Sequence, residues 1–259
     1  MNMFSLPHPE ELRKTRAEYC EGGVKQGKNV LAICFNKGVV LLSENEHLPN
    51  KYCIDELHDR IAIAGVGEQS SYDQIRQKAT LYAAAREMQF DPLDVNADSV
   101  IRDVISPYLR EVFFNPYTPP KRVKFLLSEL TDHGARFYEV RYDGATGVRS
   151  TNQPFAAIGK DAESIEMALE DLARQHDFTL LDLAQAVGVG LGRLEAALRQ
   201  AAQNPNAHEQ EKKQAADDLK EFESNVKNRY LEIAVLDRTV RDRRVFGRVD
   251  AATLSPITE

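Results

Sequence analysis

Two apolar runs joined by a short turn constrain the fold of this chain more than any other feature. Residues 29–35 and 39–43 are rich in Val, Ile and Leu, and Asn36-Lys37-Gly38 lies between them. This arrangement predicts a β-hairpin, because such turn residues allow two strands to return side by side. We therefore expect the chain to build antiparallel sheet.

The remaining strand and helix patterns come in separate blocks. Strands are predicted at 61–67, 123–130, 136–142, 154–158, 230–237 and 244–249, and helices at 9–28, 71–89, 97–114, 161–176 and 180–203. Pro107 is expected to kink the helix that contains it. Hairpins that alternate with pairs of helices predict antiparallel sheets under helical layers rather than βαβ units. The order indicates an α+β fold, a four-layer α/β/β/α sandwich.

The length of 259 residues is sufficient for one large domain, which we place at residues 9–250. Residues 1–8 are expected to be a separate N-terminal tail, and 251–259 a loose C-terminal tail. A polar segment rich in Ala, Glu and Lys, at about 204–228, is expected to be an exposed helix or a mobile insertion. We expect no chemistry in that segment.

Charge and apolar content exclude two classes of partner. The formal net charge of −7 disfavours binding to a phosphate backbone, so no nucleic-acid partner is expected. The apolar runs are far shorter than the roughly 20 residues that span a bilayer, and the first residues lack a signal-peptide pattern. We therefore expect no membrane partner and a cytoplasmic location.

The cysteines and histidines suggest neither disulfides nor a metal site. The three cysteines, Cys20, Cys34 and Cys53, include no CxxC pair, which is typical of small buried residues in a reducing compartment. The six histidines do not fall at ligand spacings with one another or with the cysteines. No metal and no cofactor are expected.

No enzyme motif is complete in this sequence. Gly65-Val66-Gly67 follows a predicted strand, but Ser70 replaces the third glycine of a dinucleotide motif. Cys34 lies inside an apolar strand, where neither exposure nor a positive neighbour is expected to favour the thiolate. Several carboxylates gather near Lys51 and Arg60, and we interpret them as a solvated face rather than as acid–base groups. These carboxylates are Glu44, Asp55, Glu56 and Asp59.

Eight short blocks, in order, resemble the α-type subunit of the proteasome core particle, in the bacterial form found alongside the ubiquitin-like tagging system of actinobacteria. They are Arg16-Ala17-Glu18-Tyr19, Gly23-Val24-Lys25-Gln26-Gly27-Lys28, the strand pair 30–35 and 38–43, Glu56-Leu57-His58-Asp59-Arg60-Ile61, Ala64-Gly65-Val66-Gly67, 137–144, Ala157-Ile158-Gly159 and 231–237. The resemblance extends from about residue 9 to about residue 249. It implies the N-terminal nucleophile hydrolase fold.

The resemblance also implies that this chain has no catalytic residues. In this family the β-type subunits are catalytic: an N-terminal threonine attacks the peptide carbonyl, its own amine acts as the base, and an acidic residue and a lysine assist. Alignment of the strands places Lys28 at the threonine position, Glu44 at the acidic position and Cys53 at the lysine position. A thiol cannot supply an ammonium charge. The helix predicted at 9–28 is retained in α subunits, whereas β subunits are cut before the first strand.

The implied function is structural. Seven α subunits form each outer ring of the particle, and two such rings enclose the β rings. The implied partners are therefore copies of this chain, proteasome β subunits, a ring-shaped AAA+ ATPase and protein substrates. The apolar residues Met3, Phe4 and Leu6 are expected to close the axial pore.

The resemblance also predicts pockets between neighbouring α subunits that dock the C-terminal tails of the ATPase. Lys51 and Arg60 are the candidate cations, with Gly27 and Glu18 at the rim. Bacterial relatives carry a lysine where this chain has Tyr52-Cys53, so the identity of the cation is open. Two other functions also remain open: an active N-terminal-nucleophile hydrolase that uses Cys34 or a serine, and a monomeric adaptor.

Overall fold

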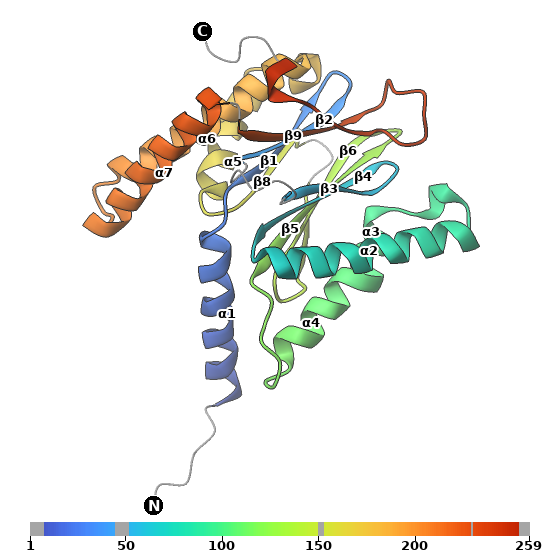
Figure 1. The fold of residues 1–259 in the computed structure, drawn as a ribbon, viewed down its shortest axis with the longest axis horizontal. Helices are drawn as coiled ribbons and strands as arrows, with labels where there is room; N and C mark the ends of the chain where they lie inside the picture. Colours follow the sequence, from blue (N-terminus) through green and yellow to red (C-terminus); the bar gives the residue numbers. More distant parts are fainter. Residues whose placement is uncertain (1–7, 45–51, 150–152, 229, 254–259) are drawn as a thin grey trace, which may run out of the picture.

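The computed structural model describes residues 8–44, 52–149, 153–228 and 230–253, and it contains two five-stranded antiparallel sheets (Figure 1). The first sheet has the order β10-β9-β2-β1-β8, with bounds Phe246–Arg248, Leu231–Asp237, Gly38–Glu44, Val30–Phe35 and Phe155–Ile158. The second has the order β3-β4-β5-β6-β7, with bounds Ile54–His58, Ile61–Gly67, Val123–Thr131, Gly134–Val140 and Thr146–Val148.

Helices cover the outer face of each sheet. The first sheet packs against α5 (Ala162–Ala173), α6 (Leu183–Gln203) and α7 (Glu209–Asn228), and the second against α2 (Gln69–Gln89), α3 (Ala97–Val100) and α4 (Ser106–Phe114). A third core lies between the two sheets. The predicted four-layer α/β/β/α sandwich is therefore confirmed.

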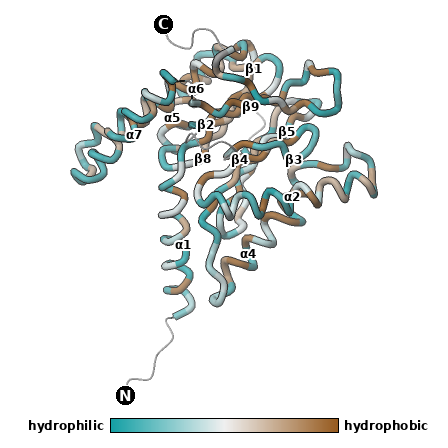
Figure 2. Tube along the Cα trace, viewed as in Figure 1, coloured by the Kyte–Doolittle hydropathy of each residue, from teal (hydrophilic) through white to brown (hydrophobic). Residues whose placement is uncertain are grey.

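Strand β1 shows why the sequence pattern is continuously apolar. Leu31 and Ile33 point toward the helices of the first sheet, whereas Val30 and Ala32 belong to the core between the sheets. Successive side chains of a strand point to opposite faces, so a strand in the middle of a sandwich needs apolar residues at every position. Figure 2 shows the hydrophobic colour concentrated in the strands and the hydrophilic colour along α7.

The first predicted hairpin is confirmed, and two strands, β3 and the three-residue β7, were not predicted. Strands β1 and β2 pair from Val30 with Ser43 to Phe35 with Gly38. Strand β3 was not predicted, because its residues 55–58 include three charged or titratable side chains and its register with β4 shifts between Glu56 and His58. A bulge of this kind breaks the two-residue alternation on which strand prediction depends.

The predicted kink near Pro107 takes the form of a wider helical turn. A π-helical segment, η2 (Ile101–Ile105), joins α3 to α4, and Pro107 lies in the first turn of α4. Proline cannot donate a backbone hydrogen bond, and its ring crowds the preceding turn. The π turn gives the chain room to continue as one helical rod.

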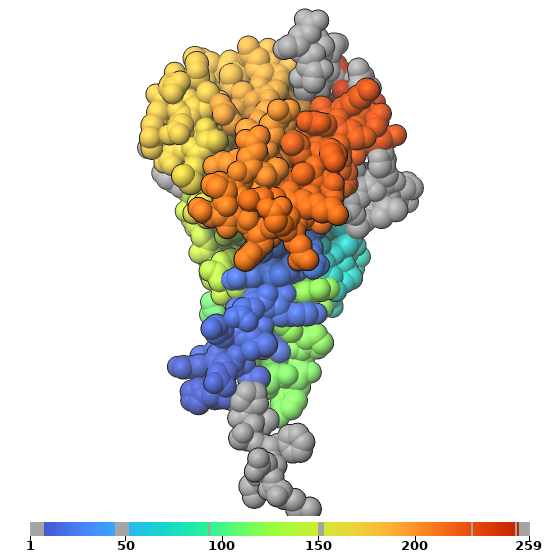
Figure 3. Space-filling view, turned by 90° about the vertical axis from the view of Figure 1, so that its left-hand side faces the viewer, coloured from blue at the N-terminus to red at the C-terminus, as the bar shows by residue number. Residues whose placement is uncertain are grey.

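The polar segment at 204–228 is a helix of the outer layer. Helix α7 packs along α6, and its Ala215 and Phe222 are buried in the core over the first sheet. Its first-turn carboxylates and its lysines lie on the outer side. Figure 3 shows α7 lying over the end of the N-terminal helix.

Helix α1 (Pro9–Lys25) ends three residues earlier than predicted and projects from the sandwich beside α4 (Figure 1). Pro9 occupies its first position, and the His8 side chain accepts a hydrogen bond from the Glu10 backbone. Arg16 fixes the helix to the body: its guanidinium donates to the backbone oxygens of Val112, Phe113 and Thr118 at 2.9, 2.8 and 2.7 Å. These carbonyls lie at the C-terminus of α4, where a cation is favoured.

Small residues allow close packing around β4. A Cβ atom at Gly65 would lie 2.2 Å from Tyr72 Cδ2. Gly67 has φ +118°, and a Cβ atom there would lie 2.1 Å from the backbone oxygen of Arg122. An alanine at residue 67 would meet both backbone strain and a steric clash with backbone.

We expect Gly67→Ala to lower the free energy of unfolding by about 3 kcal/mol or more, since strain and overpacking both contribute. Gly134→Ala is the matched control, because Gly134 has φ +134° but nothing within 4 Å of the added Cβ. It should cost only about 1–2 kcal/mol, from strain alone. Denaturant unfolding of both variants measures the difference, and equal losses would contradict the close approach at Gly67.

Candidate functional site

Lys28 and Glu44 lie together at one end of the β1–β2 hairpin. Lys28 precedes β1, and Glu44 ends β2, so the antiparallel register brings them to the same end. Lys28 Nζ is 3.6 Å from Glu44 Oε2 and 3.0 Å from Glu221 Oε1 of α7. Asn225 Nδ2, also on α7, donates to Glu44 Oε2 at 3.2 Å. The sequence indicated neither Glu221 nor Asn225, because nothing local predicts that α7 packs over this corner.

The charges at this corner hold Lys28 in its protonated form. Burial alone would lower the pKa of Lys28, but the Glu44 and Glu221 carboxylates outweigh it and raise the pKa. Burial raises the pKa of Glu44 above its ordinary value, against the opposing effects of Lys28 and Asn225. At neutral pH Lys28 is therefore an ammonium group in ion pairs, and it has no lone pair with which to attack a carbonyl or accept a proton.

Cys53 lies directly before β3, in contact with a buried carboxylate. Its Sγ is 3.1 Å from Glu232 Oε2, and burial together with the Glu232 charge raises the pKa of the thiol well above its usual value. Glu232 Oε1 accepts hydrogen bonds from the Ile54 backbone at 3.0 Å and from Arg248 Nη1 at 2.9 Å. Arg248 also pairs with Asp55 at 2.8 Å. The cation of this cluster is thus Arg248, and two carboxylates, Glu232 and Asp55, neutralise it.

A cavity of about 370 Å³ opens beside the end of α1. Its lining includes Lys25, Gly27, Lys28, Glu44 and Lys160. Lys160 pairs with Asp218 at 3.2 Å, whereas Lys25 has no ion-pair partner among the described residues. Gly27 packs closely on the end of β4, since a Cβ atom there would lie 2.6 Å from Val66 Cγ1.

Arg60 does not line this cavity within one chain. It lies in the β3–β4 turn and pairs with Asp132 at 3.1 Å. Gly27 contacts the opposite end of β4, at Gly67, so the seven-residue strand separates the two by roughly 20 Å. Glu18 is exposed on α1. Lys51 and the predicted gate residues Met3, Phe4 and Leu6 fall outside the described residues.

Cys34 differs in two respects from the expectation. It lines a cavity and is only partly buried, and Arg238 is a positive neighbour. Burial nevertheless raises the pKa of its thiol to about 12, against the opposing effect of Arg238. The thiolate that a cysteine nucleophile requires is therefore disfavoured at neutral pH.

The described part of the chain has neither a metal-binding cluster nor a helix that could cross a membrane. Residues 8–44, 52–149, 153–228 and 230–253 contain no group of three or more His, Cys, Asp or Glu placed to hold a metal ion. Within the same ranges, no helix combines the length and the apolar content needed to cross a membrane.

Comparison with known proteins identifies the family of this chain. The sequence model of a family described as "Proteasome subunit" matches residues 24–208. The chain belongs to the proteasome subunit family. That match includes the two sheets from β1 to β8, with the Lys28–Glu44 corner and Cys53.

Curated relatives named "Proteasome subunit alpha" match nearly the whole chain. The relative from Sanguibacter keddieii is 27% identical over 99% of this chain and 89% of its own length. Those from Rhodococcus opacus and Kineococcus radiotolerans are 28% and 29% identical over 99% and 95% of this chain, and 89% and 94% of their own lengths. The resemblance to the α-type subunit of these bacteria is confirmed.

Proposed function

We propose that this chain is a non-catalytic α subunit of a bacterial proteasome core, acting in protein degradation in the cytoplasm. The observation that carries the proposal is the continuous path from α1 through Lys28 into β1, with Lys28 fixed in ion pairs at the position of the family's nucleophile. A threonine peptidase of this family needs a free α-amine at that position. In this chain the position is internal, and the side chain is a protonated amine.

The isolated chain is expected to show no peptide hydrolysis. Fluorogenic peptides with acidic, basic and apolar residues before the cleaved bond should all remain intact over hours. Lys28→Thr should be equally inactive, because the hydroxyl would have no α-amine beside it. Hydrolysis by the wild-type chain that Cys34→Ala abolishes would instead support the alternative hydrolase, with Cys34 as its nucleophile.

The surfaces of the chain support a ring with a gate at its centre. Helix α1 projects from the body (Figure 1), and Tyr19 near its C-terminal end stays half exposed although its ring lies against Arg122, 5.1 Å from the guanidinium carbon. We propose that α1 forms the lateral contact in a seven-membered ring and that the residues before it converge on the axis. The apolar residues Met3, Phe4 and Leu6 would then narrow the pore, and β subunits would bind the other face of the ring.

The cavity beside Gly27 supports a docking role for the C-terminal tails of a ring-shaped ATPase. We propose Lys25 as its cation, because it lines the cavity and has no ion-pair partner among the described residues. Lys28 is already paired with Glu44 and Glu221, and Arg60 lies at the far end of β4. A carboxylate that enters this cavity would therefore meet Lys25 first. Glu18 is exposed on α1 and does not line this cavity within one chain.

We expect Lys25→Ala to weaken binding of a peptide with the ATPase C-terminal sequence by about tenfold, since a charge-assisted hydrogen bond is lost. Arg60→Ala is the matched control and should leave binding unchanged. Fluorescence anisotropy with a labelled tail peptide, on the assembled particle, measures both. If Arg60→Ala weakens binding of the peptide and Lys25→Ala leaves it unchanged, the docking site lies at the β3–β4 turn instead.

A further inference from the structure

A second cavity, of about 680 Å³, opens at the other end of β1 from the Lys28 corner. Three connections surround it: the β1–β2 turn, the β5–β6 turn and the segment that follows α5. Arg238, the first residue after β9, completes its wall. No function proposed above uses this cavity.

The cavity has an apolar wall that is fixed by packing. Phe35 and Phe178 line it and are 5% and 1% exposed. The Phe178 ring packs against Phe155 with 6.0 Å between the centroids, which anchors the short helix η3 (Phe178–Leu180) to β8. Ala135 and Pro154 add further apolar surface. A preformed wall of this kind favours the apolar part of a ligand.

The polar part of the cavity is positively charged. The backbone nitrogen of Arg238 donates to Lys37 O at 2.8 Å, which fixes the start of its loop, but no carboxylate among the described residues pairs with its guanidinium. The cavity's carboxylate, Asp177, accepts hydrogen bonds at Oδ1 from the Thr179 backbone and hydroxyl, at 2.9 and 2.7 Å. Asp237, beside Arg238, likewise accepts hydrogen bonds at Oδ1 from the backbone and the hydroxyl of Thr239.

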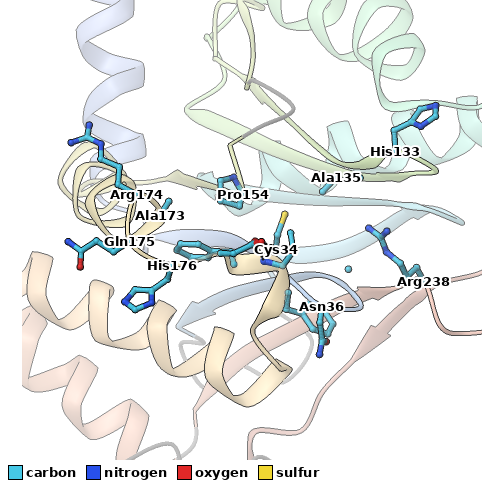
Figure 4. A pocket seen from close by; sticks show the side chains of 16 residues that line it. Cys34, Asn36, His133, Ala135, Pro154, Ala173, Arg174, Gln175, His176 and Arg238 are labelled. Atoms are coloured by element: carbon cyan, nitrogen blue, oxygen red, sulfur yellow. Dashed lines mark hydrogen bonds between the residues drawn. The ribbon is translucent and has the colours of Figure 1, made fainter.

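Figure 4 shows how these groups are distributed. Arg238 and His133 lie at one end, Arg174 and His176 at the other, and Cys34 between them. Arg174 pairs with Asp171 at 3.3 Å, which leaves Arg238 as the cation available to a ligand. An unpaired guanidinium beside an apolar wall is suited to a molecule with one apolar and one anionic end.

We propose that this cavity binds a small organic anion, with its apolar body on Phe35 and Phe178 and its carboxylate or phosphate on Arg238. The volume lies within the roughly 300–1,000 Å³ that small-molecule sites occupy. A guanidinium binds a carboxylate or a phosphate through paired N–H donors. Together with the apolar wall, it favours ligands that carry both an anionic group and an apolar body. The proposal is independent of the ring, the gate and the docking of an ATPase.

Isothermal titration of the purified chain with four probes tests the proposal. These are 3-phenylpropionate, phenyl phosphate, the uncharged 3-phenylpropanamide and inorganic phosphate. At least one of the two aromatic anions should bind, more tightly than the amide and than inorganic phosphate, and the tighter of the two identifies the head group. Equal binding of the amide, or binding of neither aromatic anion at millimolar concentration, would overturn the proposal.

Two variants locate the charge. Arg238→Gln should weaken binding of the aromatic anion at least about tenfold, whereas Arg238→Lys should retain part of it. Arg241→Gln, an exposed arginine of the same loop outside the cavity, should bind as the wild type does. Unchanged binding in Arg238→Gln would overturn the assignment.

The wild-type chain provides a readout that needs no variant. Cys34 lines the cavity, whereas Cys20 is fully buried in α1, so alkylation by iodoacetamide at pH 9, where more of the Cys34 thiol is ionised, can be followed by peptide mass with Cys20 as the shielded reference. The bound anion should slow labelling of Cys34 and leave that of Cys20 unchanged. Binding in the titration without protection of Cys34 would place the anion elsewhere and contradict the proposal.

Discussion

Removing residues 1–6 is expected to open the particle to unfolded protein while its rings stay intact. The truncation ends before His8 and Pro9, which cap and begin α1, so the helix keeps its first turn and its Arg16 contacts. Removal of Met3, Phe4 and Leu6 should widen the pore, because these are the apolar side chains that we place on the axis. Degradation of an unfolded protein should rise several-fold, and more than hydrolysis of a short peptide, which passes through partial openings.

The measurement compares particles that contain the catalytic β subunit and either the full or the truncated α ring. A variant that keeps the length of the tail but replaces Met3, Phe4 and Leu6 by serine separates side chains from length, and it should open the pore as well. If both rates stay at the wild-type level in the truncated particle, another element closes the channel. The gate assignment would then be withdrawn.

Detaching α1 from the body is expected to abolish ring assembly. Arg16 donates hydrogen bonds to three backbone oxygens at and beyond the end of α4, and hydrogen bonds to charged groups contribute about 1.5–3 kcal/mol each. Arg16→Met should therefore lower stability by about 2 kcal/mol or more and leave α1 unable to hold its place in a lateral contact. Deletion of residues 1–28 should have the larger effect and leave monomers or aggregates.

Arg241→Met is the matched control, because this exposed arginine lies far from α1 in the β9–β10 loop. Size-exclusion chromatography with light scattering distinguishes rings from monomers in all three variants. Leu12→Asp tests whether an apolar side chain of α1 contributes to the lateral contact between subunits, since Leu12 is only partly buried within one chain. Intact rings after deletion of residues 1–28 would show that α1 is dispensable.

Local chemistry was sufficient to predict the hairpins and the helix starts. The Asn36-Lys37-Gly38 turn specifies the β1–β2 hairpin, and Pro9 with the acidic residues that follow it specifies the start of α1. Strand β3 escaped because its bulge and its charged residues hide the alternation. The burial of Phe222 in α7 was equally hidden, since its neighbours are Lys, Glu and Ser and its partner helix α6 is predicted independently.

The sequence predicted the pair of site residues that face each other across one hairpin. It did not predict the contacts that site residues make with side chains far along the chain. Lys28 and Glu44 follow from the β1–β2 register. Glu221, Glu232 and Arg248 come from the last third of the chain, and no local pattern links them to this corner. Arg60 and Gly27 were grouped because the resemblance implies a docking pocket between neighbouring subunits, and within one chain they lie at opposite ends of β4.

Native mass spectrometry of the chain purified alone tests the central claim, that it is a ring-forming and non-catalytic subunit. The account predicts a species at seven times the 29.2 kDa chain mass, or at fourteen times if two rings stack, with no peptidase activity in the same sample. A chain that remains at 29.2 kDa at micromolar concentration, or a ring that cleaves peptides without a β subunit, would contradict it.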